Sequence, residues 1–179
     1  SLLGPVRRIT GLSKITFPER TITSKPKYGT KIKVEVPTHT IGLMEFANGA
    51  IVTITASDDV WGTRIPHIEI YGTEGTLSVP DPNNFGGPVA VLRAGSIEWK
   101  EMPLTHGYAG QSRSIGVADM AKAIKVGRPH RANGEMAYHV LDVMNAFQDA
   151  SDRGMHVELQ STCARPDPLP MGLRNGVLD

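Results

Sequence analysis

The stretch TIGLMEFANGAIVTITA, residues 40–56, carries the clearest structural signal in this chain. Two runs of apolar and β-branched residues flank the dipeptide Asn48-Gly49. Asn-Gly between two such runs is the strongest short hairpin signal, because both residues of the tight turn then take positive φ. The stretch therefore predicts two antiparallel strands that meet at Asn48-Gly49.

More strands are predicted on both sides of this hairpin. KIKVEV, residues 31–36, alternates apolar and charged residues, and HIEIY, GTLSV, PVAVLR and SIEWKEM follow the hairpin at short intervals. Such intervals leave no room for the crossover helices that parallel strands need. The strands are therefore predicted to pair in antiparallel fashion.

Two segments after the strands have helical periodicity. Ser114 is predicted to begin a helix that ends at Gly127, and Asn133 a helix that ends at Gly154. Their apolar stripes consist of Val117, Met120, Ala121 and Ile124, and of Met136, Val140, Val143, Met144 and Phe147.

Strands followed by helices indicate an α+β fold, a largely antiparallel open β-sheet with helices packed on one face. We expect a single domain over residues 1–160 and a Pro-rich extended tail over 161–179.

The first strand of the central hairpin is apolar on both sides. Ile41 and Leu43 point one way, and Met44 and Phe46 point the other. A strand with two apolar sides is expected to be covered on both. The helices can cover one side, and a second subunit or a second domain is predicted to cover the other. The alternative is that these residues lie at a sheet end beneath a loop.

The composition excludes several classes of function. The formal net charge is +1, from 19 basic and 18 acidic residues, which gives no drive toward nucleic acid or an acidic membrane. No apolar run is long enough to span a bilayer. The single cysteine, Cys163, cannot form an internal disulfide, and no zinc-ligand spacing is present. A cytoplasmic location is the expectation.

Gly72 and Gly75 raise the question of a phosphate-binding loop. Such a loop needs its glycines between a strand and the N-terminus of a helix, where backbone N–H groups face the anion. The next segment here is another strand, and Glu74 would repel a phosphate. We therefore interpret Gly72–Gly75 as a tight turn.

Two polar segments are candidates for small-molecule recognition. The first, before IEIYG, contains Trp61, Arg64 and His67, an aromatic ring and cations that suit a sugar or an anionic group. The second is the loop at residues 105–114, which contains His106, Tyr108, Gln111 and Arg113. The alternatives are a β-bulge with Trp61 in the core, and an ordinary exposed connection.

Three further sets have simpler interpretations. Glu135, His139 and Asp142 share one helix face, as metal ligands or a general base would, but such sets are usually solvated or at an interface. The cluster RPHR at residues 128–131 has the charge to hold an anion, but is more often a solvated turn. Cys163 lies in a Pro-rich tail, which is not the fixed setting that a catalytic thiol needs.

Four stretches in order resemble the C-terminal domain of the Gfo/Idh/MocA family of NAD(P)-dependent oxidoreductases. They are LLGPVRRITG, VPTHTIGLMEFANGAIVTITAS, HIEIYGTEGTLSVPDP and VADMAKAIKVGRPHRANGEMAYHVLDVMNAFQDASDRGMHVEL. The resemblance runs from about Leu3 to about Leu159, and its specificity comes from the combination and order of the four.

This resemblance implies a substrate-binding and oligomerisation domain of an enzyme that acts on a sugar, a polyol or a related alcohol or carbonyl. NAD or NADP would bind an N-terminal Rossmann domain that is absent from this chain, and the catalytic residues would lie upstream. We therefore assign no catalytic, cofactor-binding or metal-binding residue here, and Lys25, which lacks the preceding Glu of the family's motif, is not called catalytic.

The resemblance further implies a homo-oligomer formed through the open sheet face. It places the segments Trp61–His67 and His106–Arg113 toward the substrate. The alternative function is a free-standing, non-catalytic binding or dimerisation module.

Overall fold

The computed structural model describes residues 2–110 and 112–179, so Gln111 of the candidate loop lies outside the described residues. The chain divides into two compact units. The first comprises residues up to Gly62 together with Asn133–Pro166, and the second comprises Thr63–Ala132 together with Asp167–Asp179. The residues that the sequence suggests as one tail, 161–179, are thus shared between the two units.

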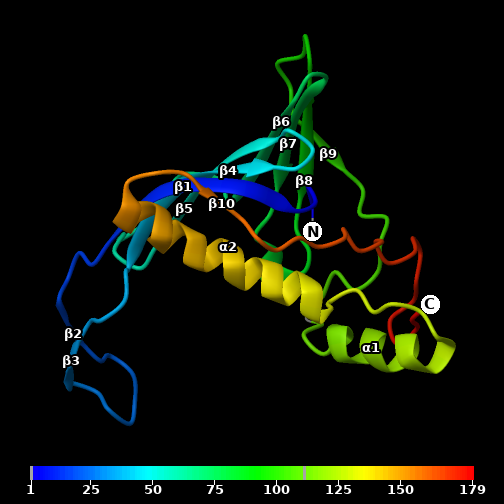
Figure 1. Cartoon of the computed structure of the whole chain (residues 1–179). Helices are drawn as coiled ribbons and strands as arrows, with labels where there is room; N and C mark the ends of the chain where they lie inside the picture. Colours follow the sequence, from blue (N-terminus) through cyan, green and yellow to red (C-terminus); the bar gives the residue numbers. More distant parts are fainter. Residues whose placement is uncertain (1, 111) are drawn as a thin grey trace. The chain divides into compact units, whose positions relative to one another are not determined.

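The first unit combines an antiparallel sheet with one long helix (Figure 1). Four strands pair in the order β10-β1-β4-β5, and β2 pairs with β3 in a separate ribbon. The bounds are β1 (Val6–Lys14), β2 (Glu19–Thr21), β3 (Lys31–Lys33), β4 (His39–Phe46), β5 (Ile51–Ser57), α2 (Gly134–Arg153) and β10 (Val157–Glu158).

The hairpin expected at residues 40–56 is confirmed, but its turn is of another type. β4 and β5 pair antiparallel from His39↔Ser57 to Glu45↔Ile51. Gly49 alone of the Asn-Gly pair has positive φ, at 88°. The Gly49 N–H donates to the Phe46 carbonyl and the Phe46 N–H to the Ala50 carbonyl, each at 2.9 Å. This is the longer loop in which a single left-handed glycine follows an ordinary turn, so Asn48 need not take positive φ.

Two glycines facing each other on β1 and β4 make room for the core aromatic of this unit. Gly11 pairs with Gly42 in the sheet register. A Cβ added to Gly42 would lie 2.5 Å from the Phe147 ring, and one added to Gly11 would lie 2.9 Å from it. Phe147 of α2 thus rests directly on the backbone of the sheet, beside Ile9, which is 1% exposed.

The inner face of α2 differs from its predicted stripe. Phe147 is buried and Val143 packs against the core, as predicted, but Val140 and Met144 are 51% and 65% exposed. Small or polar residues take the other inner positions, namely His139, Ala146 and Ala150. The small side chains let the helix lie close to the sheet, and hydropathy alone does not favour them.

The ribbon of β2 and β3 forms an arm that extends beyond β1 and β4 (Figure 1). The strand predicted over residues 31–36 is only Lys31–Lys33, because its partner β2 has three residues. Neither face of the ribbon is covered, and Ile32 is 44% exposed. Its base is fixed by Asp59, which accepts hydrogen bonds from Arg20 and, at 2.6 Å, from the Thr38 hydroxyl.

The second unit contains a four-stranded antiparallel sheet in the order β6-β7-β8-β9 and the shorter helix. The bounds are β6 (Ile68–Gly72), β7 (Gly75–Val79), the 3₁₀ turn η1 (Pro82–Asn84), β8 (Val89–Arg93), β9 (Lys100–Met102) and α1 (Ile115–Val126). The predicted apolar stripe of α1 is largely exposed, with Val117 at 71% and Ile124 at 75%. Asp119 and Ala123 are its buried residues.

Antiparallel open sheets with two helices confirm the α+β fold class. The helix ends are also confirmed, since Gly127 and Gly154 occupy left-handed C-cap positions and the Asn133 side chain accepts from the Met136 N–H at 2.8 Å. Ser114 takes the N-cap position of α1, although its side chain makes no capping bond. Among the described residues, no helix is both long and apolar enough to cross a membrane.

Candidate functional site

The segment before β6 is exposed and belongs to no helix or strand. Trp61 is 100% exposed, so the alternative that it packs in the core is wrong. Arg64 is also exposed. Trp61 belongs to the first unit, whereas Arg64 and His67 belong to the second.

Within the second unit, the turn η1 brings two predicted site residues together. His67 Nε2 lies 4.0 Å from Asp81 Oδ2, and the Arg113 guanidinium donates to Asn83 Oδ1 at 2.5 Å. Arg113 also lies over the ring of Phe85, 5.7 Å from its centroid. The Asp81 side chain accepts from the Asn83 N–H at 2.9 Å and so holds the turn that carries these groups.

His106 lies close to the same turn, because it lines a cavity together with Phe85. Both residues line a cavity of about 300 Å³ in the second unit. His106 Nδ1 is 3.0 Å from the Thr105 hydroxyl. The lining is completed by Val89, Met102, Pro103, Leu104, Thr105, Gly107 and Ala109. The strand residues Val89 and Met102 thus give the cavity apolar lining, and His106 adds an imidazole to it.

Tyr108 contacts the C-terminal segment of the chain. Its hydroxyl donates to the Val177 carbonyl at 2.6 Å, and its backbone has φ of +64°. Asp81, Asn83 and Phe85 were not singled out in the sequence. The run of Asp, Pro and Asn at residues 81–84 is a turn signal that was available to find them.

The glycine pair at Gly72 and Gly75 is a hairpin turn, as interpreted from the sequence. Gly72 pairs with Gly75 at the end of β6 and β7. A Cβ on Gly75 would lie 2.3 Å from the Leu92 carbonyl oxygen of β8, and its φ is +154°. Close strand approach therefore accounts for this glycine.

Buried His139 and half-buried Asp142, both on α2, connect the helix to Val6 and Ser161 in the first unit. His139 Nε2 accepts from the Val6 N–H at 3.0 Å, so neutral His139 carries its proton on Nδ1. Nδ1 lies 2.8 Å from the Ser161 hydroxyl, which donates to Asp142 at 2.6 Å. The hydrogen bond from the Ser161 hydroxyl lowers the pKa of Asp142, whereas burial of the carboxyl group acts in the opposite direction. Glu135 is exposed, and the residues that the structure describes include no group of three or more potential metal ligands.

The arginines at positions 128 and 131 are occupied by carboxylates. Buried Asp119 accepts from Arg128 at 2.7 Å and from the Arg131 backbone N–H at 2.8 Å, and it pairs with the Arg131 guanidinium. Burial raises the pKa of Asp119, but these donors outweigh it and lower the pKa below 3.8. The cluster is an internal ion-pair network, and no free anion is needed to neutralise it.

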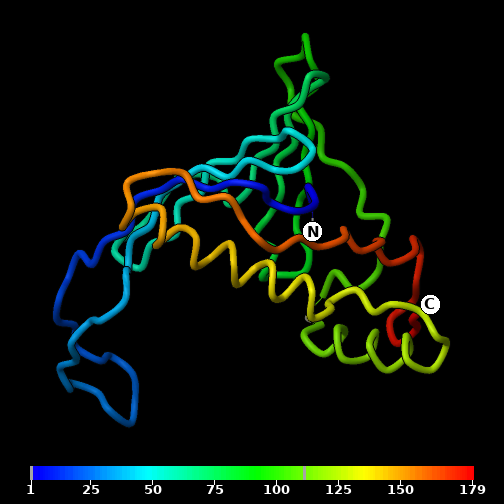
Figure 2. Tube along the Cα trace, in the orientation of Figure 1, coloured from blue at the N-terminus to red at the C-terminus, as the bar shows by residue number. Residues whose placement is uncertain are grey.

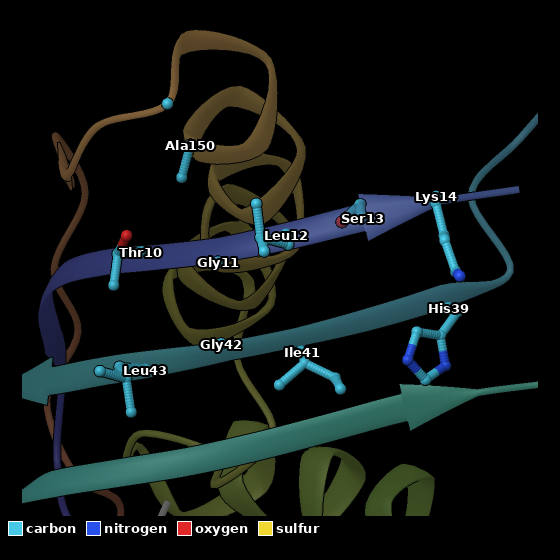
Figure 3. Close-up of a pocket in the computed structure, with 11 residues that line it drawn as sticks. Thr10, Gly11, Leu12, Ser13, Lys14, His39, Ile41, Gly42, Leu43 and Ala150 are labelled. Carbon is cyan, nitrogen blue, oxygen red and sulfur yellow. The ribbon is translucent and has the colours of Figure 1, made fainter.

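The face of the first sheet opposite α2 is open and apolar. Leu12, Ile41 and Leu43 lie together on β1 and β4 and are 73%, 48% and 45% exposed (Figure 3). A hollow of about 660 Å³ extends over this face and around β1, with Lys14 and His39 at one end. Met44 and Phe46 pack on the α2 side instead, so the predicted two-sided character of β4 is confirmed.

Residues 1–78 match the family model described as the GFO/IDH/MocA C-terminal domain. Over these residues, the match agrees with the resemblance indicated by the sequence motifs. No curated protein matches the chain.

Solved structures share the fold. Levoglucosan dehydrogenase in its apo form superposes with a TM-score of 0.71 at 21% identity, over 89% of this chain and 47% of its own. An NAD binding oxidoreductase from Klebsiella pneumoniae superposes with a TM-score of 0.67 at 21% identity, over 88% of this chain and 46% of its own. An oxidoreductase domain protein from Kribbella flavida superposes with a TM-score of 0.67 at 18% identity, over 87% of this chain and 46% of its own. The chain therefore spans less than half the length of these proteins.

Proposed function

We propose that this chain is the substrate-binding and oligomerisation domain of an NAD(P)-dependent oxidoreductase that acts on a sugar, a polyol or a related alcohol or carbonyl. The observation that carries the proposal is the family match over residues 1–78. Levoglucosan dehydrogenase, which shares the fold at 20% identity, has been solved with NADH, and another of its structures at 21% identity contains L-sorbose besides NADH.

The cofactor in this proposal is held by an N-terminal Rossmann domain and not by the residues described above. Gly72 and Gly75, the best phosphate-loop candidate, serve strand pairing. When bound, the nicotinamide would supply the hydride acceptor or donor. We assign the catalytic proton transfer to residues upstream of this chain, and we make no choice between NAD and NADP.

The substrate in this proposal contacts the second unit around η1. His67, His106 and Arg113 lie around the segment Asp81–Phe85. His67 Nε2 is 4.0 Å from the Asp81 carboxylate, His106 shares a cavity wall with Phe85, and the Arg113 guanidinium lies over the Phe85 ring. Imidazole and guanidinium groups donate to sugar hydroxyls or a carboxylate, and the Phe85 ring offers an apolar surface to a sugar ring. Trp61, Arg64 and Tyr108 remain predicted substrate-binding residues.

The site is tested by titrating the chain with L-sorbose and measuring affinity by calorimetry. Arg113→Gln is expected to weaken binding about tenfold, because it removes a charged donor worth about 1.4 kcal/mol or more. Arg93→Gln, at an exposed position on β8, is the matched control and is expected to bind as the unmodified chain does. Equal affinity of the two variants would argue against this site.

The alternative of a free-standing binding or dimerisation module makes a different prediction for the reading frame. The oxidoreductase proposal requires upstream codons for a G-x-G-x-x-G unit after a strand and for an E-K-P motif. A reading frame without them would favour the module.

A further inference from the structure

The last nine residues, Met171–Asp179, lie against the loop that lines the candidate cavity. We name this segment the C-terminal strap. The Gly172 N–H donates to the Thr105 carbonyl at 3.0 Å, and the Tyr108 hydroxyl donates to the Val177 carbonyl at 2.6 Å. Between these bonds, a Cβ on Gly107 would lie 2.3 Å from the Leu173 carbonyl oxygen, so strap and loop are in backbone contact.

The strap is also anchored at its end. Arg131 donates to the Asp179 carboxylate at 2.8 Å, and Arg128 donates to the Asp179 carbonyl at 3.0 Å. Both arginines are themselves fixed by buried Asp119. Figure 2 shows the red end of the chain returning beside α1, which carries Asp119. Arg131 further donates to the carbonyls of Asp167 and Pro168, where the segment leading to the strap begins.

Loop residues need such support, because one of them is held in an unfavourable backbone conformation. Tyr108 has φ of +64°, in the left-handed region that residues with a Cβ rarely adopt. Its neighbours His106, Gly107 and Ala109 line the cavity, whereas no described residue of the strap does so. The strap can therefore influence the cavity only through the loop.

We propose that the C-terminal strap is a positioning element, which holds the loop Thr105–Ala109 so that His106 faces the substrate cavity. The effect of the strap on substrate binding rests on the proposed function. The contact between strap and loop does not depend on that function. The Tyr108 hydroxyl is then part of the contact between the strap and the loop.

Two matched pairs of variants test the proposal in the complete chain. Gly107→Ala forces a Cβ into the Leu173 carbonyl, whereas Gly110→Ala meets nothing within 4 Å in the same loop. Asp179→Ala removes the distal anchor, whereas Asp167→Ala removes an exposed carboxylate and keeps the carbonyl that Arg131 uses. Circular dichroism verifies that each variant is folded. Should Gly107→Ala fail to fold, Asp179→Ala decides the outcome, since it leaves the loop unchanged.

The first readout is trypsin cleavage after Arg174, which is exposed within the strap, together with hydrogen exchange of the Gly172 amide. Both processes follow the population in which the strap has opened. Gly107→Ala and Asp179→Ala are expected to raise both rates about tenfold, and the controls are expected to match the unmodified chain. Equal rates in a variant and its control would overturn the proposal.

The second readout is the affinity for L-sorbose, which we expect to fall about tenfold in Asp179→Ala and to stay unchanged in Asp167→Ala. A released strap with unchanged L-sorbose affinity would overturn the positioning role. If the unmodified chain binds no L-sorbose, the proposed function fails, and the strap is then judged by whether Asp179→Ala accelerates exchange at the amides of residues 106–109.

Discussion

Phe147 and Gly42 show how single residues determine the core of the first unit. The Phe147 ring occupies the space that side chains at positions 11 and 42 would need, so the surfaces of α2 and the sheet fit together there. Interiors of proteins are packed as densely as crystals, and an additional methyl group there must displace its neighbours. Glycine in a strand normally weakens it, and close approach by Phe147 explains its presence here.

Replacing Gly42 by alanine is expected to destabilise the chain by about 1–3 kcal/mol, through overpacking. The new Cβ would lie 2.4 Å from the Thr10 carbonyl oxygen and 2.5 Å from the Phe147 ring. Gly62→Ala is the control, because a Cβ there meets nothing within 4 Å and the backbone needs no positive φ. Urea unfolding, monitored by circular dichroism, measures the stability of both variants. Equal unfolding midpoints would contradict the packing described for Phe147.

The helices show what periodicity can predict and what it cannot. The ends of α1 and α2 follow from Gly127, Asn133 and Gly154, whose local conformations depend on few neighbours. The inner faces were predicted less well, because Met144 and Ile124 are apolar yet exposed. Periodicity finds apolar stripes but does not tell which one meets the sheet.

The candidate site depends even more on distant contacts. His67, His106 and Arg113 were recognisable from their chemistry, but their common neighbour, Asp81–Phe85, is brought to them by the fold. The tail could be identified as Pro-rich, and its contact with the loop at Tyr108 spans 69 residues. No local sequence pattern encodes a partner at that separation.

The ion-pair network of α1 makes the stability of the second unit dependent on pH. Because folding lowers the pKa of Asp119, its stabilisation is fully present above 3.8 and is lost as the pH falls through the lower folded-state value. Asp119→Asn is therefore expected to cost about 1–3 kcal/mol at pH 7 and progressively less below pH 3.8.

Glu74→Gln, on the exposed turn between β6 and β7, is the control and is expected to leave the free energy of unfolding unchanged at pH 7 and below pH 3.8. Thermal unfolding of both variants and of the unmodified chain, measured from pH 7 down to acidic pH, gives the cost of each substitution. A cost for Asp119→Asn that stays constant down to the most acidic pH would contradict the role assigned to the network.

At the scale of the whole molecule, the open face of the first sheet is an exposed apolar surface that needs an explanation. Leu12, Ile41, Leu43 and Ile51 are all at least 45% exposed. Covering such surface gains about 25 cal/mol per Å² removed from water, which favours association. The proposed oligomer would use this face.

Leu43→Asp is expected to convert the oligomer to a monomer, because a carboxylate would be buried at the centre of the proposed interface. Met144→Asp places the same charge on the exposed side of α2, away from that face, and is expected to preserve the assembly. Light scattering at several concentrations distinguishes the two. A monomeric unmodified chain, or an equal effect of both variants, would refute association through the sheet.

The central claim is that this domain binds the substrate of an oxidoreductase and leaves the dinucleotide to another domain. Its most direct test is calorimetric titration of the chain with L-sorbose and, separately, with NADH. The account predicts saturable binding of L-sorbose that is weakened about tenfold by Arg113→Gln, and no saturable binding of NADH. Micromolar binding of NADH, or no binding of L-sorbose at all, would contradict it.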